Sequence, residues 1–127
     1  MRFPDKLDVL AIHSRLIAET GGTTGLRDKG LLESALAAAE NRFNYESADV
    51  AKCAATYAYH LTQAHAFVDG NKRLAAAITE TFLESNGSEL VMNNDEVARL
   101  FLDIAAGVLT RKEVEELLRE NIRKRNS

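Results

Sequence analysis

The strongest constraint on the fold is a polar segment of nine residues, His65–Arg73, between two alanine-rich segments with helical periodicity. Before it, apolar residues cover a wide face of the segment 47–64, which predicts a central, deeply buried helix. After it, the segment 74–85 repeats this pattern and stops at Asn86-Gly87, a typical C-terminal helix signal. The polar segment is therefore predicted to be a loop that joins two buried helices.

Four further helices are predicted from apolar residues at helical spacing, and short polar side chains mark where helices begin. These candidate N-cap residues are Asp5, Asp28, Ser47, Asn93 and Thr110. Glu96 and Glu113 complete capping boxes in the last two helices. Gly21-Gly22 is predicted to end the first helix.

Few residues remain outside this helical pattern. Thr23–Arg27 is predicted to be a short irregular connection, and Glu89–Met92 an isolated extended piece. Arg123–Arg125 is predicted to finish the last helix, where positive charge complements the negative helix end. Strand signals are nearly absent, so we predict an all-α fold of six helices in a single compact domain, residues 1–127.

The segment Asn41–Glu46 alternates polar and aromatic residues, which leaves its structure open. It is predicted to be either a loop or a short extended flap. In an extended flap, Phe43 and Tyr45 would lie on one face. The two aromatic side chains could then cover the edge of the core or dock a substrate.

The composition describes one domain with an ordinary, mixed-charge surface. The chain of 127 residues is 46% hydrophobic, enough for a single core. Its net charge of −3 gives no footprint of general nucleic-acid binding. Cys53 is the sole cysteine, which excludes an intrachain disulfide, and it is predicted to be a small buried side chain. No signal peptide or membrane span is recognisable, so the cytoplasm is the expected location.

The segment Gly70–Arg73 has the composition of a phosphate-binding helix start. The first N–H groups of a helix lack intrahelical acceptors and, together with the helix dipole, attract anions. Gly70 allows close approach of a phosphate, and Asn71 would add a side-chain donor. Lys72 and Arg73 add positive charge. Because Asp69 would be out of place among these groups, we predict that it holds Mg²⁺ on nucleotide phosphates.

His65 lies at the other lip of the same loop. An unperturbed imidazole is largely neutral at cellular pH and can accept a proton, so His65 is a candidate general base. Phe67 is predicted to anchor the loop in the core. A base, a metal ligand and a phosphate cradle are the parts needed to transfer a phosphorus group to a hydroxyl. The simpler interpretation is that His65 pairs with Asp69 and that the cations are solvated. His13, in the first helix, is predicted to be a partly buried, hydrogen-bonded residue.

These residues resemble the signature of the Fic/Doc superfamily, which reads His, any, Phe, any, Asp or Glu, Gly or Ala, Asn, Gly or Lys, Arg. The matching residues are His65, Phe67, Asp69, Gly70, Asn71, Lys72 and Arg73. At roughly one-in-twenty odds per position, a chance match falls below about one in a million per starting point. Shorter similarities at 21–22, 26–28, 32–35 and 43–45 look like the N-terminal half of the Doc (death-on-curing) toxin branch.

Two positions place the resemblance nearer to Doc than to Fic. Fic adenylyltransferases usually have Gly where this chain has Lys72, and a second Arg where it has Ala76. The resemblance to Doc implies a toxin kinase that transfers the γ-phosphate of ATP, with Mg²⁺, to a Thr or Ser hydroxyl of a translation factor, elongation factor Tu in the family. It implies His65 as the catalytic base, Asp69 as the magnesium ligand and Gly70–Arg73 as the nucleotide site.

The resemblance also indicates how the protein is regulated, and two alternative functions remain open. It implies a small antitoxin protein of the Phd type as partner. The charge and the hydropathy of the sequence predict no direct nucleic-acid partner and no membrane. Many Fic proteins carry an inhibitory helix with Ser or Thr, three residues, Glu, then Gly or Asn, and this sequence has no such match. The alternatives are a Fic-type protein adenylyltransferase and a non-catalytic protein-binding module that uses the same groove.

Overall fold

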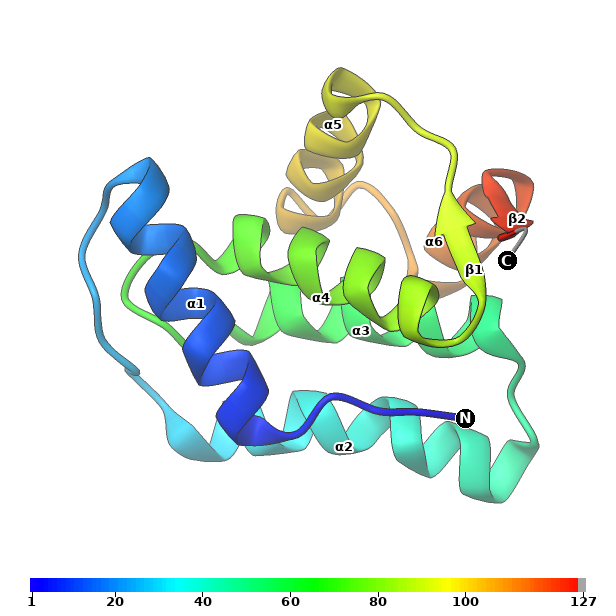
Figure 1. The fold of residues 1–127 in the computed structure, drawn as a ribbon, viewed down its shortest axis with the longest axis horizontal. Helices are drawn as coiled ribbons and strands as arrows, with labels where there is room; N and C mark the ends of the chain where they lie inside the picture. The colour runs from blue at the N-terminus through cyan, green and yellow to red at the C-terminus, as the bar shows by residue number, and fades with distance from the viewer. Residues whose placement is uncertain (126–127) are drawn as a thin grey trace.

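The computed structural model describes residues 1–125, which form six helices and two short strands. The helices are α1 (Lys6–Thr20), α2 (Lys29–Glu46), α3 (Val50–Ala64), α4 (Asn71–Ser85), α5 (Asn94–Ala105) and α6 (Arg111–Glu120). The strands are β1 (Ser88–Leu90) and β2 (Ile122–Lys124). The prediction of an all-α domain is confirmed. Figure 1 shows α2, α3 and α4 running side by side, with α1 crossing one end of the group.

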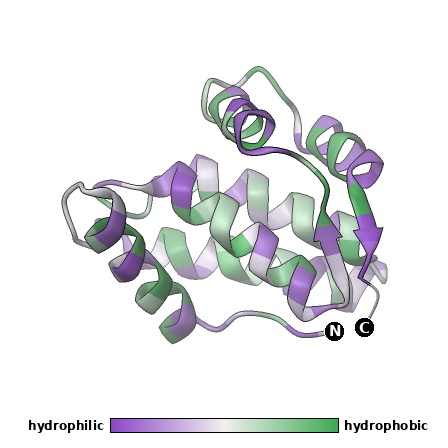
Figure 2. Ribbon diagram, turned by 45° about the horizontal axis from the view of Figure 1, so that its top comes forward, coloured by the Kyte–Doolittle hydropathy of each residue, from purple (hydrophilic) through white to green (hydrophobic). Residues whose placement is uncertain are grey.

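α3 is the central helix, since it packs against α2, α4, α5 and α6. Its small side chains allow neighbouring helices to approach closely, and Cys53 is buried among them as predicted. The larger core side chains come from the surrounding helices, such as Phe82, Ile104 and Leu118. Burying a side chain of that size stabilises the fold by about 1.5–3 kcal/mol. Figure 2 shows the resulting hydrophobic and hydrophilic sides of the helices.

Residues 41–46 form the last turns of α2, so the predicted loop or extended flap is wrong. Side chains two positions apart in a helix point in different directions. Phe43 packs on Phe3 at the edge of the core, with ring centroids 5.6 Å apart, whereas Tyr45 is 84% exposed. Figure 1 places this end of α2 at the opposite end of the molecule from the loop between α3 and α4. The two aromatic side chains therefore do not form a flap over that loop.

The cap predicted for the third helix also lies at a different residue. Ser47 adopts a left-handed conformation, φ 53°, and its amide donates to carbonyl groups in the last turn of α2. It closes α2 instead of opening α3. The N-cap of α3 is Asp49, whose side chain accepts from the amide of Lys52.

The C-terminal basic segment is not the end of a helix. α6 stops at Glu120, and residues 122–124 form β2, which pairs antiparallel with β1. The pairing sets Glu89 opposite Arg123, whose Nε donates to the Glu89 carboxylate at 2.5 Å. The predicted isolated extended piece at 89–92 is thus half of a two-stranded ribbon, because its partner lies far away in sequence.

The polar segment predicted from the sequence joins α3 to α4. The end of α3 and the start of α4 therefore lie on the same side of the molecule (Figure 1). The chain between α1 and α2, residues 21–28, runs past this loop and forms an antiparallel bridge with it, Leu26 to Phe67. The fold thereby brings residues from the first quarter of the chain onto the loop. None of the helices in residues 1–125 combines the length and the apolar character needed to cross a membrane.

Candidate active site

Two residues with a left-handed backbone conformation lie at the two ends of the loop between α3 and α4. His65, the C-cap of α3, has φ 47°, and Gly70, the N-cap of α4, has φ 78°. This conformation is open to glycine but costs a histidine of order 1–3 kcal/mol, so surrounding contacts must hold it. The guanidinium of Arg27 supplies one of them, donating to the His65 carbonyl at 2.7 Å.

Asn71 closes the loop on itself. Its Oδ1 accepts from the Phe67 amide at 3.0 Å, and its Nδ2 donates to the Phe67 carbonyl at 2.9 Å. Both polar ends of the side chain are therefore used on the backbone of one residue. Asn71 thus holds the loop, and the phosphate contact predicted for its side chain stays a prediction.

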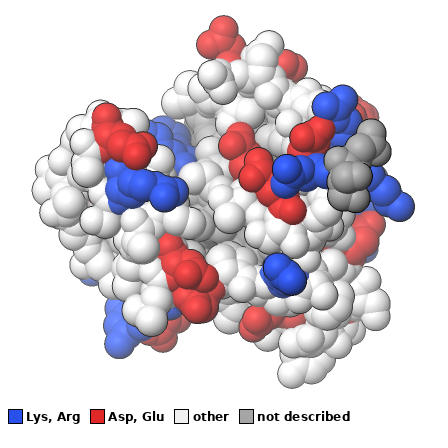
Figure 3. Space-filling view, in the orientation of Figure 1, with Lys and Arg blue, Asp and Glu red and all other residues white. Residues whose placement is uncertain are grey.

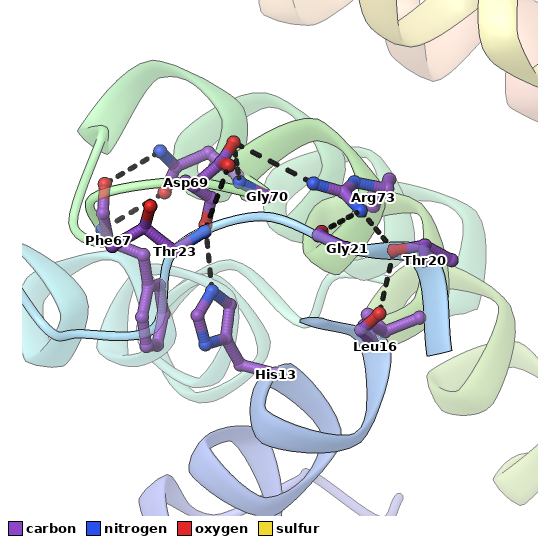
Figure 4. A network of polar contacts seen from close by, with 10 residues as sticks. His13, Leu16, Thr20, Gly21, Thr23, Phe67, Asp69, Gly70 and Arg73 are labelled. Atoms are coloured by element: carbon purple, nitrogen blue, oxygen red, sulfur yellow. Dashed lines mark hydrogen bonds and ion pairs between the residues drawn. The ribbon is translucent and has the colours of Figure 1, made fainter. Parts of the chain in front are cut away.

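Phe67 lies in the core, 3% exposed, and its ring stacks on His13 of α1 with centroids 3.8 Å apart. His13 is itself 3% exposed, and its Nε2 lies 2.7 Å from the carbonyl oxygen of Asp69. Because a carbonyl can only accept, Nε2 carries the proton and donates. His13 is buried and hydrogen-bonded, as predicted. It contacts the loop at two residues, Phe67 by ring stacking and Asp69 by the hydrogen bond (Figure 4).

The Asp69 carboxylate faces backbone donors. It accepts from the amide of Thr23 at 3.2 Å and from that of Gly70 at 2.8 Å. These hydrogen bonds, with a smaller contribution from the charge of Arg73, hold the pKa of Asp69 below its usual range. A Cβ atom built on Gly22, which has φ 118°, would lie 2.5 Å from Asp69 Oδ2. A side chain at position 22 would strain the backbone and displace the Asp69 carboxylate, so the double glycine does more than end α1.

Arg73 joins α4 to the end of α1. Its Nη1 donates to the hydroxyl of Thr20 and to the carbonyl of Gly21, the latter at 3.0 Å, and its Nη2 lies 3.6 Å from Asp69 Oδ1. The positive charge thus sits at the negative end of the α1 dipole, where it is stabilising. Figure 4 shows Arg73 between Asp69 and the last turn of α1.

The segment 22–28, here termed the strap, runs along the loop. The Val68 amide donates to the carbonyl of Gly25 at 3.0 Å, and the amides of Arg27 and Asp28 donate to the carbonyl of Ala66 at 2.7 and 2.9 Å. Most of this segment was predicted to be an irregular connection. His13, Gly22, Thr23 and Arg27 were therefore missed as supports of the site. The second of two adjacent glycines was the one local signal available.

The side chains of His65 and Lys72 are exposed on either lip of this braced loop. Within residues 1–125, neither side chain takes part in a hydrogen bond or ion pair. The pair between His65 and Asp69 that the simpler interpretation requires is therefore not formed. The geometry leaves an imidazole, a cation and the first turn of α4, which has no side-chain cap at Gly70, open to a ligand.

A groove of about 520 Å³ begins beside Lys72 and Arg73 and runs between α1, α4 and α5. Its walls are mainly apolar and include Ala76 and Phe101. Figure 3 shows an uncharged hollow in this part of the surface, while acidic and basic side chains are interspersed around it. One carboxyl group lines the groove, that of Glu80, whose pKa is raised by burial and by the charge of Glu84.

The donor set at Asp69 suits a magnesium ion bound together with phosphates. Among residues 1–125, no group of three or more His, Cys, Asp or Glu side chains could enclose a metal. Mg²⁺ is usually held by one or two carboxylates plus substrate phosphates, so a single exposed carboxylate beside an uncapped helix start fits that mode. The side chain of Asp69 is 47% exposed and its lone pairs are not all used by its amide donors.

Comparison with known proteins agrees with this geometry. The sequence matches the Fic/DOC family over residues 3–83, which include the strap, the loop and most of α4. The chain is also 32% identical over 120 residues to a protein named protein kinase doc from Escherichia phage P1, and the alignment covers 94% of each chain.

Proposed function

The chain belongs to the Fic/DOC family, in its Doc branch, and on that premise we propose that it is a Doc-like toxin kinase. In this proposal it transfers the γ-phosphate of ATP to a Thr or Ser hydroxyl of a translation factor, with elongation factor Tu as the first candidate. The observation that carries the proposal is the exposed pair of His65 and Lys72 on a loop whose backbone is held by hydrogen bonds from Arg27 and Asn71.

His65 is the proposed general base. Its backbone is fixed by its left-handed conformation and by Arg27, while its imidazole is free to meet a substrate hydroxyl. A neutral imidazole removes the proton as the hydroxyl attacks the phosphorus atom, and general-base catalysis of this kind contributes about 10²–10⁴-fold. Because the backbone is fixed, the position of the imidazole depends only on the rotamer of the His65 side chain.

The first turn of α4 is the proposed phosphate cradle. Its backbone N–H groups and Lys72 supply donors and positive charge, and Gly70 keeps the approach open. Arg73 contributes its charge from the edge, because its guanidinium also binds Thr20 and Gly21. Asn71 acts indirectly by fixing Phe67 and hence the curvature of the loop.

Asp69 is the proposed magnesium ligand. Its lowered pKa keeps the carboxylate ionised at any physiological pH, and Gly22 leaves room for it. Magnesium bound with the nucleotide would neutralise phosphate charge in the transition state. The amides of Thr23 and Gly70 fix the direction of the carboxylate.

Phosphoryl transfer is favoured over adenylyl transfer by two side chains of α4. Lys72 stands on the lip of the site, where its length restricts how deep the α-phosphate can enter, and Ala76 offers no cation to the γ-phosphate. Incubating the protein and a bacterial lysate with ATP labelled at either the α- or the γ-phosphate tests this choice. Protein labelling from the γ position alone is expected, and labelling from the α position would replace the kinase by an adenylyltransferase.

Catalysis itself is tested by His65→Ala. If the protein is a kinase, induction of this variant should no longer arrest growth, and transfer of label should fall by about two to four orders of magnitude. A variant as toxic as the wild type would instead favour a non-catalytic module that acts by binding.

The groove between α1, α4 and α5 is the proposed seat of a small antitoxin of the Phd type. Its apolar walls suit the hydrophobic side of a peptide helix, and its open end reaches Lys72 and Arg73. A bound peptide would then cover the nucleotide site. Co-expression with the product of the adjacent reading frame should restore growth, and Ala98→Arg in the groove wall should abolish that rescue without lowering toxicity.

A further inference from the structure

A second cluster of polar groups lies where α2, α3 and α6 meet. It is separate from the loop between α3 and α4, residues 65–73, which is termed the motif loop below. Four cationic side chains line one pocket of about 250 Å³ there: Arg42, Lys52, Arg111 and Lys112. The lining contains one carboxylate, Glu115. In a chain of net charge −3, four cations around one small pocket are a local excess of positive charge.

α3 holds the two guanidinium groups of this pocket in place. Arg42 Nη1 donates to Thr56 Oγ1 at 3.0 Å, and Arg111 Nη1 donates to His60 Nε2 at 3.2 Å. Thr56 and His60 are four residues apart and share one side of the helix with Lys52. Burial and the charges of Arg111 and Arg42 lower the pKa of His60, which keeps its ring neutral and able to accept.

The nearby carboxylates are largely committed to another arginine. Arg119 lies 3.3 Å from Glu115 and makes two hydrogen bonds to Asp49, at 2.8 and 3.1 Å. Within residues 1–125, no carboxylate oxygen lies within 4.0 Å of a side-chain nitrogen of Lys52, Arg111 or Lys112. These three cations face the pocket without an acidic partner.

Arg42 is similarly left with an unused donor. Its side chain is 13% exposed, and its Nε is buried without a hydrogen-bond partner, although Glu46 lies at an ion-pair distance of 3.5 Å. A buried N–H group without a hydrogen-bond acceptor is destabilising. An oxyanion in the pocket would relieve the repulsion among the cations and offer acceptors to their remaining N–H groups.

We propose that this pocket, lined by Arg42, Lys52, Arg111 and Lys112, binds a phosphate-type oxyanion. Guanidinium groups bind two phosphate oxygens at once, and the start of α6, at Arg111, adds the positive end of a helix dipole. The volume is below the ~300–1,000 Å³ of pockets that enclose drug-sized ligands. The pocket therefore receives free phosphate or the phosphate group of a nucleotide whose remainder stays outside.

The test is a titration of the ¹⁵N-labelled full chain with sodium phosphate at constant ionic strength. Saturable shifts are expected at the side-chain Nε–H of Arg42 and Arg111 and at the amides of residues 111–113. A parallel titration with AMP distinguishes the sources: stronger binding of AMP identifies a nucleotide phosphate, and stronger binding of inorganic phosphate identifies the free ion. Shifts that are absent, linear in concentration or reproduced by sodium chloride overturn the proposal.

Three variants separate this pocket from the motif loop. Arg111→Gln and Lys112→Gln should each weaken phosphate binding by about tenfold or more, while the folded spectrum is kept. Lys124→Gln removes the same charge from β2 and should leave the affinity unchanged. Unchanged affinity in both pocket variants, or shifts confined to residues 70–73, refutes the proposal. So does tighter binding of a hexaglutamate peptide to the same resonances, since the partner would then be an acidic protein segment.

Discussion

Replacing His13 by Phe separates the two contacts that this side chain makes with the motif loop. The Phe variant keeps an aromatic ring to stack on Phe67 but removes the donor to the Asp69 carbonyl. Replacement by Leu removes both. The pair of variants therefore tests whether α1 positions the loop through the hydrogen bond or only fills space beneath it.

The expected loss of stability follows from the geometry of the two contacts. The hydrogen bond is short, 2.7 Å, and partly buried, so losing the donor and leaving the carbonyl unsatisfied should lower the free energy of unfolding by about 1–3 kcal/mol. Losing the stack as well should add about 0.5–1.5 kcal/mol. Because the Asp69 backbone then loses its support from α1, a displacement near ~1 Å would lower the rate of phosphate transfer by about 10²-fold.

Urea unfolding measures the stability, and transfer of the γ-phosphate from saturating ATP to lysate proteins measures the activity. Val9→Ala is the matched control, since Val9 is fully buried on the same helix and its loss of two methyl groups costs about 2 kcal/mol. The control should keep its activity. If His13→Phe loses as much stability as Val9→Ala and retains the same rate, the hydrogen bond does not position the loop and this reasoning is refuted.

Three further predictions concern Gly22, Cys53 and Asp69. Gly22→Ala should reduce phosphate transfer by at least about tenfold, whereas Gly87→Ala, also at positive φ but with open space around it, should lose stability alone; enzyme assay and urea unfolding of both separate steric clash from backbone strain. Cys53 is fully buried and its pKa is raised to about 11, so iodoacetamide at about pH 8 should leave the native protein unmodified and react only in urea, as mass spectrometry would record. Asp69 has a pKa below its ordinary 3.8, so its stabilising contribution is complete above that value and is lost as the pH falls through the lower folded value. Asp69→Asn should therefore flatten the acid side of the pH–stability curve, and identical curves would contradict the assigned hydrogen bonds.

The helices could be predicted from the sequence because their determinants are local. Asp5, Asp28, Asn93 and Thr110 cap the helices that they were predicted to cap. Residues 41–46 were misjudged because their alternating pattern resembles a strand, whereas Arg42 forms an ion pair with Glu46 one helical turn later and Phe43 packs on Phe3. The β1–β2 pair was missed because each strand is too short to be recognised without its distant partner.

The residues of the candidate site also divide into those close together in the sequence and those that meet only in the fold. The proximity of the residues in the nine-residue loop could be predicted, because they are close together in the sequence. His13 and Arg27 could not, since each contacts the loop across a long separation in sequence. The role of Asn71 also depends on geometry, because an amide beside a phosphate and an amide that closes a loop look alike in sequence.

The strap has a genetic consequence for the proposed growth-arresting activity. Substitutions that let cells survive its expression should fall into two groups far apart in the gene. One group would alter the codons of the loop and the start of α4, and the other those of residues 13–28, which donate no group to the chemistry yet hold the loop through Gly22, Thr23 and Arg27. Survivors from the second group would still produce a folded helical protein with its base and its cradle residues unchanged in identity.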